Sequence, residues 1–171
     1  KVEYTNILIY RKSYSIFSYR RVRSTFRKAV NTQEMEKCMQ QEITRVALDA
    51  MGGDNAPGEL VKGAVDAVNG RSDIKVLLVG QQDVVEKELK QYSYPKEQIE
   101  VVHAEEVIET AEPPVNAIRK KKQSSIVVGM NMVKQKEADA FVSAGSSGAI
   151  LVGGQVIVGR IRGIERPPLA P

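Results

Sequence analysis

The hydrophobic pattern of the chain becomes regular only after residue 44. From there, short continuous apolar runs are typical of strands buried on both faces of a parallel sheet, and they occupy residues 45–48, 74–79, 99–102 and 140–142. Between these runs, apolar residues recur three and four positions apart, which is the spacing of one helix face. The helical patterns cover residues 58–68, 84–92, 115–122 and 126–136. Strands that alternate with helices predict an α/β fold.

The expected architecture is a three-layer α/β/α sandwich around a mainly parallel sheet. A chain of 171 residues is about one domain, and 42% hydrophobic residues are enough for a globular core. Asp83 is expected to cap the second helix, the proline pair at 113–114 to open the third, and Ser124 or Ser125 to cap the fourth. Segment 149–158 is apolar nearly all round, which predicts a buried helix.

The first 44 residues, here called the leader, differ from the rest in composition. They carry nine basic and four acidic side chains, whereas residues 45–171 carry 16 and 17. The basic character of the chain, whose net charge is +4, therefore belongs to the leader, and the nearly neutral globular part gives no nucleic-acid signature. The leader is interpreted as a poorly ordered extension, or as upstream sequence translated before an internal start at Met35 or Met39. A transit peptide, or a basic aromatic segment that binds anionic lipid or nucleic acid, are the alternatives.

Composition also excludes several classes of site. Cys38 is the only cysteine and His103 the only histidine, so neither an internal disulfide nor a structural zinc site is expected. No metal and no cofactor are expected. No apolar stretch reaches the length of about 18 residues that a membrane span needs.

The first turn with candidate chemistry is DAMGGDNAP at 49–57, between a predicted strand and a predicted helix. That position is where open α/β sheets bind ligands. Gly52 and Gly53 let the backbone approach a ligand closely, and the following helix directs amide groups at an anion. Asn55 is included in the binding set. An ordinary βα turn is the alternative interpretation.

The second such turn is SAGSSG at 143–148, also between a strand and a helix. Its hydroxyls and backbone amides are suited to hold a phosphate or an oxyanion. Because both turns follow parallel strands, they are expected to lie at the same edge of the sheet. The candidate binding residues of this turn are Ser143, Gly145, Ser146, Ser147 and Gly148. A serine-capped helix is the alternative interpretation.

Charged and titratable side chains supply the remaining candidates. Arg119 begins a run of four cations, of which one or two can face a site. His103 follows a predicted strand and is a candidate acid or base. Asp49 and Asp54 are candidates because they flank the glycine pair. The catalytic residues themselves remain unassigned at this point.

Five blocks of the chain, taken together, resemble the bacterial phosphate acyltransferases, a family of fatty acid and phospholipid synthesis proteins. The blocks occur in the family's order and lie at residues 49–57, 103–108, 119–122, 143–145 and 158–167. The resemblance covers residues 45–171 and leaves the leader unexplained. It implies the sandwich fold shared with isopropylmalate dehydrogenase and phosphotransacetylase.

The resemblance also implies a reaction, in which a fatty acyl group moves from acyl carrier protein to inorganic phosphate and gives acyl phosphate. It implies a cytoplasmic homodimer with a peripheral hold on the membrane. The glycines and serines of the two turns are expected to cradle phosphate or thioester. Asp49 and Asp54 are expected to fix the loop or orient partners, because a carboxylate repels a phosphate dianion.

Two departures from the family pattern stand out. The family has Gly-Asn-Thr-Gly where this chain has Gly-Ser-Ser-Gly at 145–148. The family also continues for about as many residues again, so the chain is expected to be an N-terminal part, incomplete at its C-terminus. The alternatives are an anion-binding Rossmann-like remnant whose basic leader binds lipid or nucleic acid, and a phosphotransacylase that uses coenzyme A.

Overall fold

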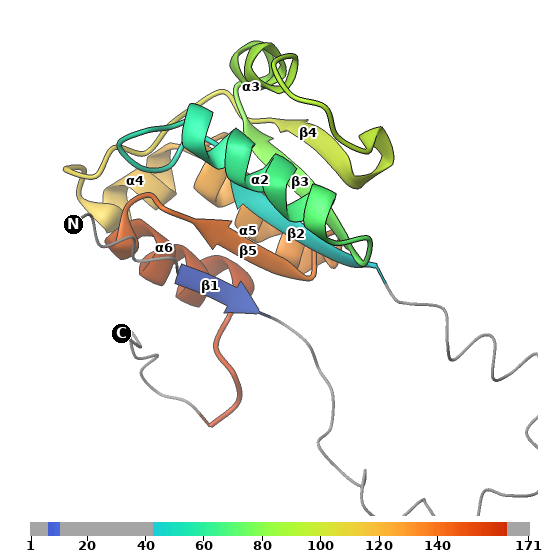
Figure 1. The fold of residues 1–171 in the computed structure, drawn as a ribbon. Coiled ribbons are helices and arrows are strands. Elements are labelled where there is room, and N and C mark those ends of the chain that lie inside the picture. Colours follow the sequence, from blue (N-terminus) through green and yellow to red (C-terminus); the bar gives the residue numbers. More distant parts are fainter. Residues whose placement is uncertain (1–6, 11–42, 164–171) are drawn as a thin grey trace, which may run out of the picture.

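The computed structural model describes residues 7–10 and 43–163. These residues form one five-stranded sheet with helices on both sides (Figure 1). The elements in chain order are β1 (Ile7–Tyr10), β2 (Thr44–Asp49), α2 (Gly58–Gly70), β3 (Ile74–Gly80), α3 (Gln82–Leu89), η1 (Lys96–Gln98), β4 (Ile99–His103), α4 (Pro114–Lys120), α5 (Ser125–Gln135), β5 (Ala140–Ser143), α6 (Ser147–Gly153) and η2 (Gly154–Val158).

The direction in which the chain adds successive strands to the sheet reverses at β2. Its strand order is β1-β5-β2-β3-β4, with β2 to β5 parallel and β1 antiparallel to β5. The chain places β3 and β4 on one side of β2 and then returns to place β5 on the other, so Leu48 pairs with Leu78 and with Val142. Such a reversal is a topological switch point, where open α/β sheets bind ligands at the carboxyl ends of their strands.

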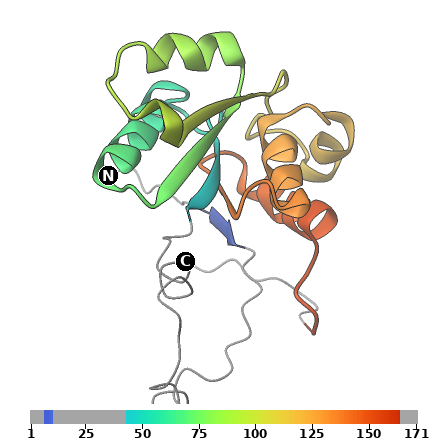
Figure 2. The same ribbon diagram turned by 90° about the vertical axis from the view of Figure 1, so that its right-hand side faces the viewer.

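Two helical layers cover the two faces of the sheet, with α2 and α3 on one face and α4, α5 and α6 on the other (Figure 2). A hydrophobic core lies on each face of the sheet, and successive strand residues point to opposite faces. Leu77 therefore packs toward α5 while Leu78 packs toward α2. Both leucines are at most 5% exposed. The predicted three-layer sandwich is confirmed, and its double coverage explains why the strands are apolar without alternation.

Strand β1 lies in the leader, where no element was expected. Its four residues pair antiparallel with β5, Ile7 opposite Ser143 and Tyr10 opposite Ala140. Its run of four apolar residues has no helical pattern after it, so it falls outside the strand–helix alternation from which the other strands were predicted. Thr44 begins β2, and leader residues 1–6 and 11–42, which include Met35 and Met39, lie outside the described part of the chain, so the interpretations of them stay predictions.

Two helix predictions were wrong in detail. Helix α3 begins at Gln82 after Gln81, so Asp83 lies in the first turn and does not cap the helix. The predicted buried helix at 149–158 consists of α6 followed by a turn of π-helix, η2. Ala149 and Ile150 are buried, whereas Val156 is 71% exposed, so the segment buries one face and not its whole circumference.

The two caps predicted around α4 and α5 were right. Pro114 is the first residue of α4, where its missing N–H leaves no helical bond unmade. Ser124 caps α5, and its hydroxyl accepts a hydrogen bond from the backbone N–H of Val127 at 3.4 Å. These short-range signals depend only on neighbouring residues, which is why the sequence shows them.

Candidate functional site

The two predicted turns lie against each other at the carboxyl end of the sheet, because β2 and β5 are neighbours. A Cβ atom on Gly52 would lie 2.8 Å from the backbone nitrogen of Gly145 and 3.0 Å from Ser143 Oγ. A Cβ atom on Gly145 would lie 3.4 Å from Gly52 Cα. The loops therefore meet backbone to backbone, at a distance that only glycine allows at position 52.

A buried carboxyl connects the two loops. Asp49, the last residue of β2, is 1% exposed. Its Oδ2 accepts a hydrogen bond from Ser143 Oγ at 2.7 Å, and its Oδ1 accepts one from the Met51 backbone N–H at 3.1 Å. Ser143 Oγ in turn accepts the backbone N–H of Gly145 at 3.0 Å. A continuous chain of hydrogen bonds thus runs from the first loop through Asp49 and Ser143 to the second.

Burial raises the pKa of Asp49 above its ordinary value, because the charged form loses its hydration. Hydrogen bonds from the hydroxyls of Ser143 and Ser125 and from the backbone of Met51 and Gly52 oppose the rise, because they favour the charged form. Ser125 is the first residue of α5, so three elements converge on this carboxyl. From the sequence, Ser125 was expected only as a possible helix cap, since nothing in the spacing connects it with Asp49.

The tips of the two loops face solvent. Gly53 has a φ of 95°, and Asp54 and Asn55 after it are exposed. In the second loop Ser147 is exposed, whereas Ser146 is 3% exposed and its hydroxyl accepts the Ala149 backbone N–H at 3.3 Å. The hydroxyl of Ser146 is therefore a helix cap, and that of Ser147 faces solvent at the same loop.

Helix α4 borders the second loop at its N-terminal end. A Cβ atom on Gly148 would lie 2.6 Å from Pro114 Cγ, so the start of α4 packs directly on the turn into α6. Arg119 is exposed and lies near the opposite end of α4. In the same cationic run, Lys121 Nζ donates to Glu112 Oε1 at 2.5 Å and to the Val107 carbonyl at 2.6 Å. Lys121 therefore holds the loop before α4, and a role for Arg119 in binding stays a prediction.

His103 is separated from the two loops by a strand. It ends β4, which lies beyond β3 from β2, so its backbone is about 10 Å from β2 at the usual strand spacing. Its side chain is exposed, and Nδ1 accepts the Gln82 backbone N–H at 3.4 Å. The structure does not bring His103 together with Asp49, and its candidacy as acid or base stays a prediction.

Within residues 7–10 and 43–163, no three His, Cys, Asp or Glu side chains gather in a way that could hold a metal ion. None of the described helices combines the length and the apolar character that crossing a membrane requires.

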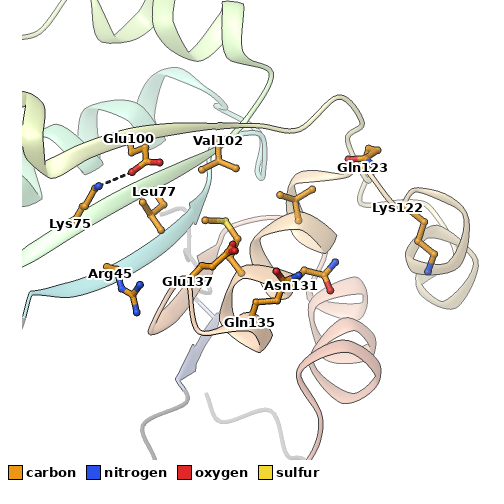
Figure 3. A pocket seen from close by; sticks show the side chains of 12 residues that line it. Arg45, Lys75, Leu77, Glu100, Val102, Lys122, Gln123, Asn131, Gln135 and Glu137 are labelled. Atoms are coloured by element: carbon orange, nitrogen blue, oxygen red, sulfur yellow. Dashed lines mark ion pairs between the residues drawn. The ribbon is translucent and has the colours of Figure 1, made fainter.

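A cavity of about 660 Å³ lies between β3, β4 and α5, and its lining extends from Arg45 and Lys75 near the amino ends of the strands to Val102 near the carboxyl end of β4 (Figure 3). Its floor includes Leu77, Val102 and Met132, and the ion pair of Lys75 with Glu100 stands on its rim. None of the candidate residues of the two turns lines it. Because open α/β sheets bind ligands in the loops that follow the strands at the switch point, and the cavity is lined by none of the candidate residues of those loops, the two loops are the candidate site.

The arrangement at the loops suits an anion held by backbone amides and a hydroxyl. Successive amides in a glycine-containing turn form a concave surface that binds phosphate without a formal positive charge. The carboxyl of Asp49 is directed inward and is surrounded by its own donors. A ligand at the loop tips, near Asn55 and Ser147, does not touch that carboxyl.

Comparisons with known proteins agree with the motif resemblance. A family model described as "Fatty acid synthesis protein" matches residues 44–171. The chain is 54% identical over 127 residues to the phosphate acyltransferase of Alkaliphilus oremlandii (strain OhILAs), which is 74% of this chain and 38% of that protein. It is 52% identical over 127 residues to the phosphate acyltransferase of Clostridium beijerinckii, and 48% identical over 126 residues to that of Clostridium acetobutylicum. In both comparisons the aligned residues are again 74% of this chain and 38% of the relative. The chain spans about 38% of the length of these curated relatives.

Proposed function

The chain belongs to the fatty acid synthesis protein family, and we propose that it supplies the phosphate-holding loops of an acyltransferase. The proposed reaction moves a fatty acyl group from acyl carrier protein to inorganic phosphate and forms acyl phosphate. The observation that carries the proposal is the contact between the loops after β2 and β5 at the switch point of the sheet. Over the aligned 127 residues, two relatives named phosphate acyltransferase are 54% and 52% identical to this chain.

The chemistry needs no protein nucleophile. A phosphate oxygen attacks the thioester carbonyl carbon, a carbon–oxygen bond forms, and the carbon–sulfur bond breaks. The carrier leaves as a thiolate that takes up a proton. The protein's task is to hold a dianion against the acyl carbonyl and to stabilise the oxyanion that develops there. Fixed backbone amides do both, because they require no reorganisation during the reaction.

In this proposal the exposed ends of the two loops contact the substrate. Gly53 and Asn55 approach phosphate from the first loop, and Ser147 and Gly148 from the second. Asp54 is exposed at the tip of the first loop and, as a carboxylate, does not bind the dianion. Gly52 and Gly145 bring the two loops within reach of one ligand.

The remaining parts of the proposal concern the whole protein. Acyl carrier protein is the acyl donor, the protein acts as a homodimer, and it works in the cytoplasm with peripheral contact to the membrane. These points are supported by the family resemblance, and no described residue is assigned to any of them.

A chimaeric enzyme tests the proposal. Residues 44–171 replace the matching segment of the Alkaliphilus phosphate acyltransferase, and acyl phosphate is trapped with hydroxylamine after incubation with acyl carrier protein thioester and phosphate. We expect the chimaera to form acyl hydroxamate in a phosphate-dependent manner. Activity with acyl coenzyme A alone would favour a phosphotransacylase that uses coenzyme A. A folded chimaera without phosphate-dependent activity toward either donor would overturn the proposal.

A matched variant of this chimaera, which carries Ser147→Ala, tests the contact of Ser147 with phosphate. Loss of one hydroxyl contact to a charged group is worth about 1.5–3 kcal/mol, or roughly ten- to hundred-fold in affinity. We expect that loss to appear in the phosphate concentration needed for half-maximal rate, with the melting temperature little changed. An unchanged phosphate dependence would show that Ser147 does not contact phosphate.

A further inference from the structure

We propose that Asp49 and Ser143 are positioning residues that hold the second loop in place for phosphate without touching it. This inference rests on the proposed function, because it concerns the same pair of loops. It departs from the expectation that the Ser143 hydroxyl is itself a ligand. The hydrogen bonds, the burial and the close contact of the two loops carry the argument.

The hydroxyl of Ser143 is fully engaged inside the protein. A serine hydroxyl has one hydrogen to donate, and Ser143 donates it to Asp49 Oδ2 at 2.7 Å. The same oxygen accepts the Gly145 backbone N–H at 3.0 Å. Ser143 is 0% exposed, so a ligand in the loop mouth does not reach it. Its function is to transmit the position of Asp49 to Gly145.

Asp49 is held from three directions. Donors reach its carboxyl from its own loop at Met51, from β5 at Ser143 and from α5 at Ser125. Burying a carboxyl is unfavourable unless hydrogen bonds satisfy it, and no buried side-chain nitrogen or oxygen within the described residues lacks a partner. A satisfied polar network of this kind fixes a unique arrangement. Asp49 thus joins β2, β5 and α5 at the switch point of the sheet.

The inward hydrogen bonds determine which loop groups remain for phosphate. The amide of Met51 is directed at Asp49 and the amide of Gly145 at Ser143. The groups that face a ligand are therefore those further along each loop, such as Asn55 and Ser147, which are exposed. Their separation depends on Gly145, because Gly52 packs directly on it. Releasing Gly145 from Ser143 lets the second loop move away from the first.

Hydrogen exchange on the isotope-labelled full chain tests the link directly and needs no ligand. In Ser143→Ala, the exchange rate of the Gly145 amide, divided by that of the core amide of Leu78, should rise about tenfold, the effect of losing one net hydrogen bond. Val68→Ala is the control, because Val68 is 2% exposed and lies in the last turn of α2, at the opposite end of that helix from the first loop. The same ratio should be unchanged in Val68→Ala. An unchanged ratio in Ser143→Ala would overturn the proposal.

Phosphate affinity tests the functional consequence. Inorganic phosphate is titrated into the same chains, and the amide signal of Ser147 is followed. We expect the dissociation constant to rise about tenfold in Ser143→Ala and in Asp49→Ala, and to stay unchanged in Val68→Ala. Asp49→Asn keeps an acceptor oxygen for Ser143, so its dissociation constant should lie nearer to that of the unmodified chain. If the affinity for phosphate fell only because the fold was destabilised, Val68→Ala would lose as much affinity as Ser143→Ala, and that result would overturn the proposal.

The two proposals fail in different ways. If the unmodified chain binds no phosphate while Ser143→Ala still releases the Gly145 amide, the link between the loops is supported and the proposed function is overturned. If phosphate binds equally well to the unmodified chain, Ser143→Ala and Asp49→Ala, the positioning role is overturned and the proposed function stands.

Discussion

The two ends of the central sheet differ in how tightly their groups are fixed. At the carboxyl end, two loops meet at glycine and a buried carboxyl receives donors from three elements. A cavity of about 660 Å³ stays open beside α5 and reaches the amino end of the sheet at Arg45 and Lys75. Its neighbouring ion pairs, Lys75 with Glu100 at 2.6 Å and Arg45 with Asp139 at 3.5 Å, are partly exposed.

The difference lies in the kind of polar contact that each end of the sheet contains. A buried network must be fully satisfied, so each of its members constrains the others. Exposed ion pairs contribute little, because water competes for both partners. The size of a hollow is therefore a poorer guide to the site than the density of buried, mutually satisfied polar groups at the switch point. Substitutions at the two ends should differ accordingly.

The largest effect is expected from Gly52→Val. Its Cβ atom would lie 2.5 Å from Asp49 Oδ2 and 2.8 Å from the Gly145 nitrogen, both fixed by the network. We expect a loss of about 3 kcal/mol or more in the free energy of unfolding, measured by urea denaturation. The control is Gly63→Ala in α2, where a Cβ atom meets nothing within 4 Å. That substitution should stabilise the chain by about 0.5–1 kcal/mol. Equal stability of the two variants would show that the loops are not tightly packed.

Ser143→Ala should have the next largest effect. It leaves Asp49 Oδ2 and the Gly145 amide without their shared partner in a buried place. We expect the free energy of unfolding to fall by about 1–3 kcal/mol. Urea denaturation at neutral pH measures it, and a change below about 0.5 kcal/mol would contradict a closed network.

The pH dependence of stability should identify Asp49. Burial raises its pKa in the folded protein above the ordinary value of 3.8, so the folded state binds more protons between those two pKa values. The resulting stability is fully present below the pKa of the unfolded chain and is lost as pH rises through the folded pKa.

Asp49→Asn cannot titrate at this position. The stability of the unmodified chain minus that of Asp49→Asn should therefore fall as pH rises above 4, by at most about 1.4 kcal/mol per pH unit. Urea denaturation at a series of pH values measures this difference. A difference that grows with pH would mean that hydrogen bonds outweigh burial at this carboxyl.

The smallest effect is expected at the amino end of the sheet. Glu100→Gln removes the charge that pairs with Lys75 on the cavity rim, where the Glu100 side chain is 55% exposed. We expect a change below about 0.5 kcal/mol in the free energy of unfolding, reduced further by salt. A loss as large as that of Ser143→Ala would remove the contrast between the two ends.

Local patterns in the sequence were sufficient for most of the fold. The apolar run of β3 and the cap at Ser124 depend on neighbouring residues, and both were predicted. The cap of α3 was not, because Asp83 has the right chemistry for a cap but lies in the first turn. Strand β1 was missed because its apolar run lies in the leader, outside the alternation of strands and helices that begins at β2.

The location of the candidate site could be predicted from the sequence, but the contacts that hold its two loops together could not. Both turns follow parallel strands, so their shared edge could be expected. Their direct contact requires β5 to return beside β2, which no short-range pattern records. The roles of Ser143 and Ser125 also depend on residues far apart in the chain that meet at Asp49. Hydroxyl spacing alone cannot distinguish a ligand from a positioning group.

One measurement tests the account most directly: which backbone amides respond when inorganic phosphate is titrated into the isotope-labelled chain at constant ionic strength. The account predicts saturable shifts at residues 53–55 and 146–148, and none around Lys75, Glu100 and Gln135, which border the cavity. Chloride at the same ionic strength should leave both regions unchanged. Shifts confined to the cavity, or no saturable shift at the two loops, would contradict the placement of the phosphate site.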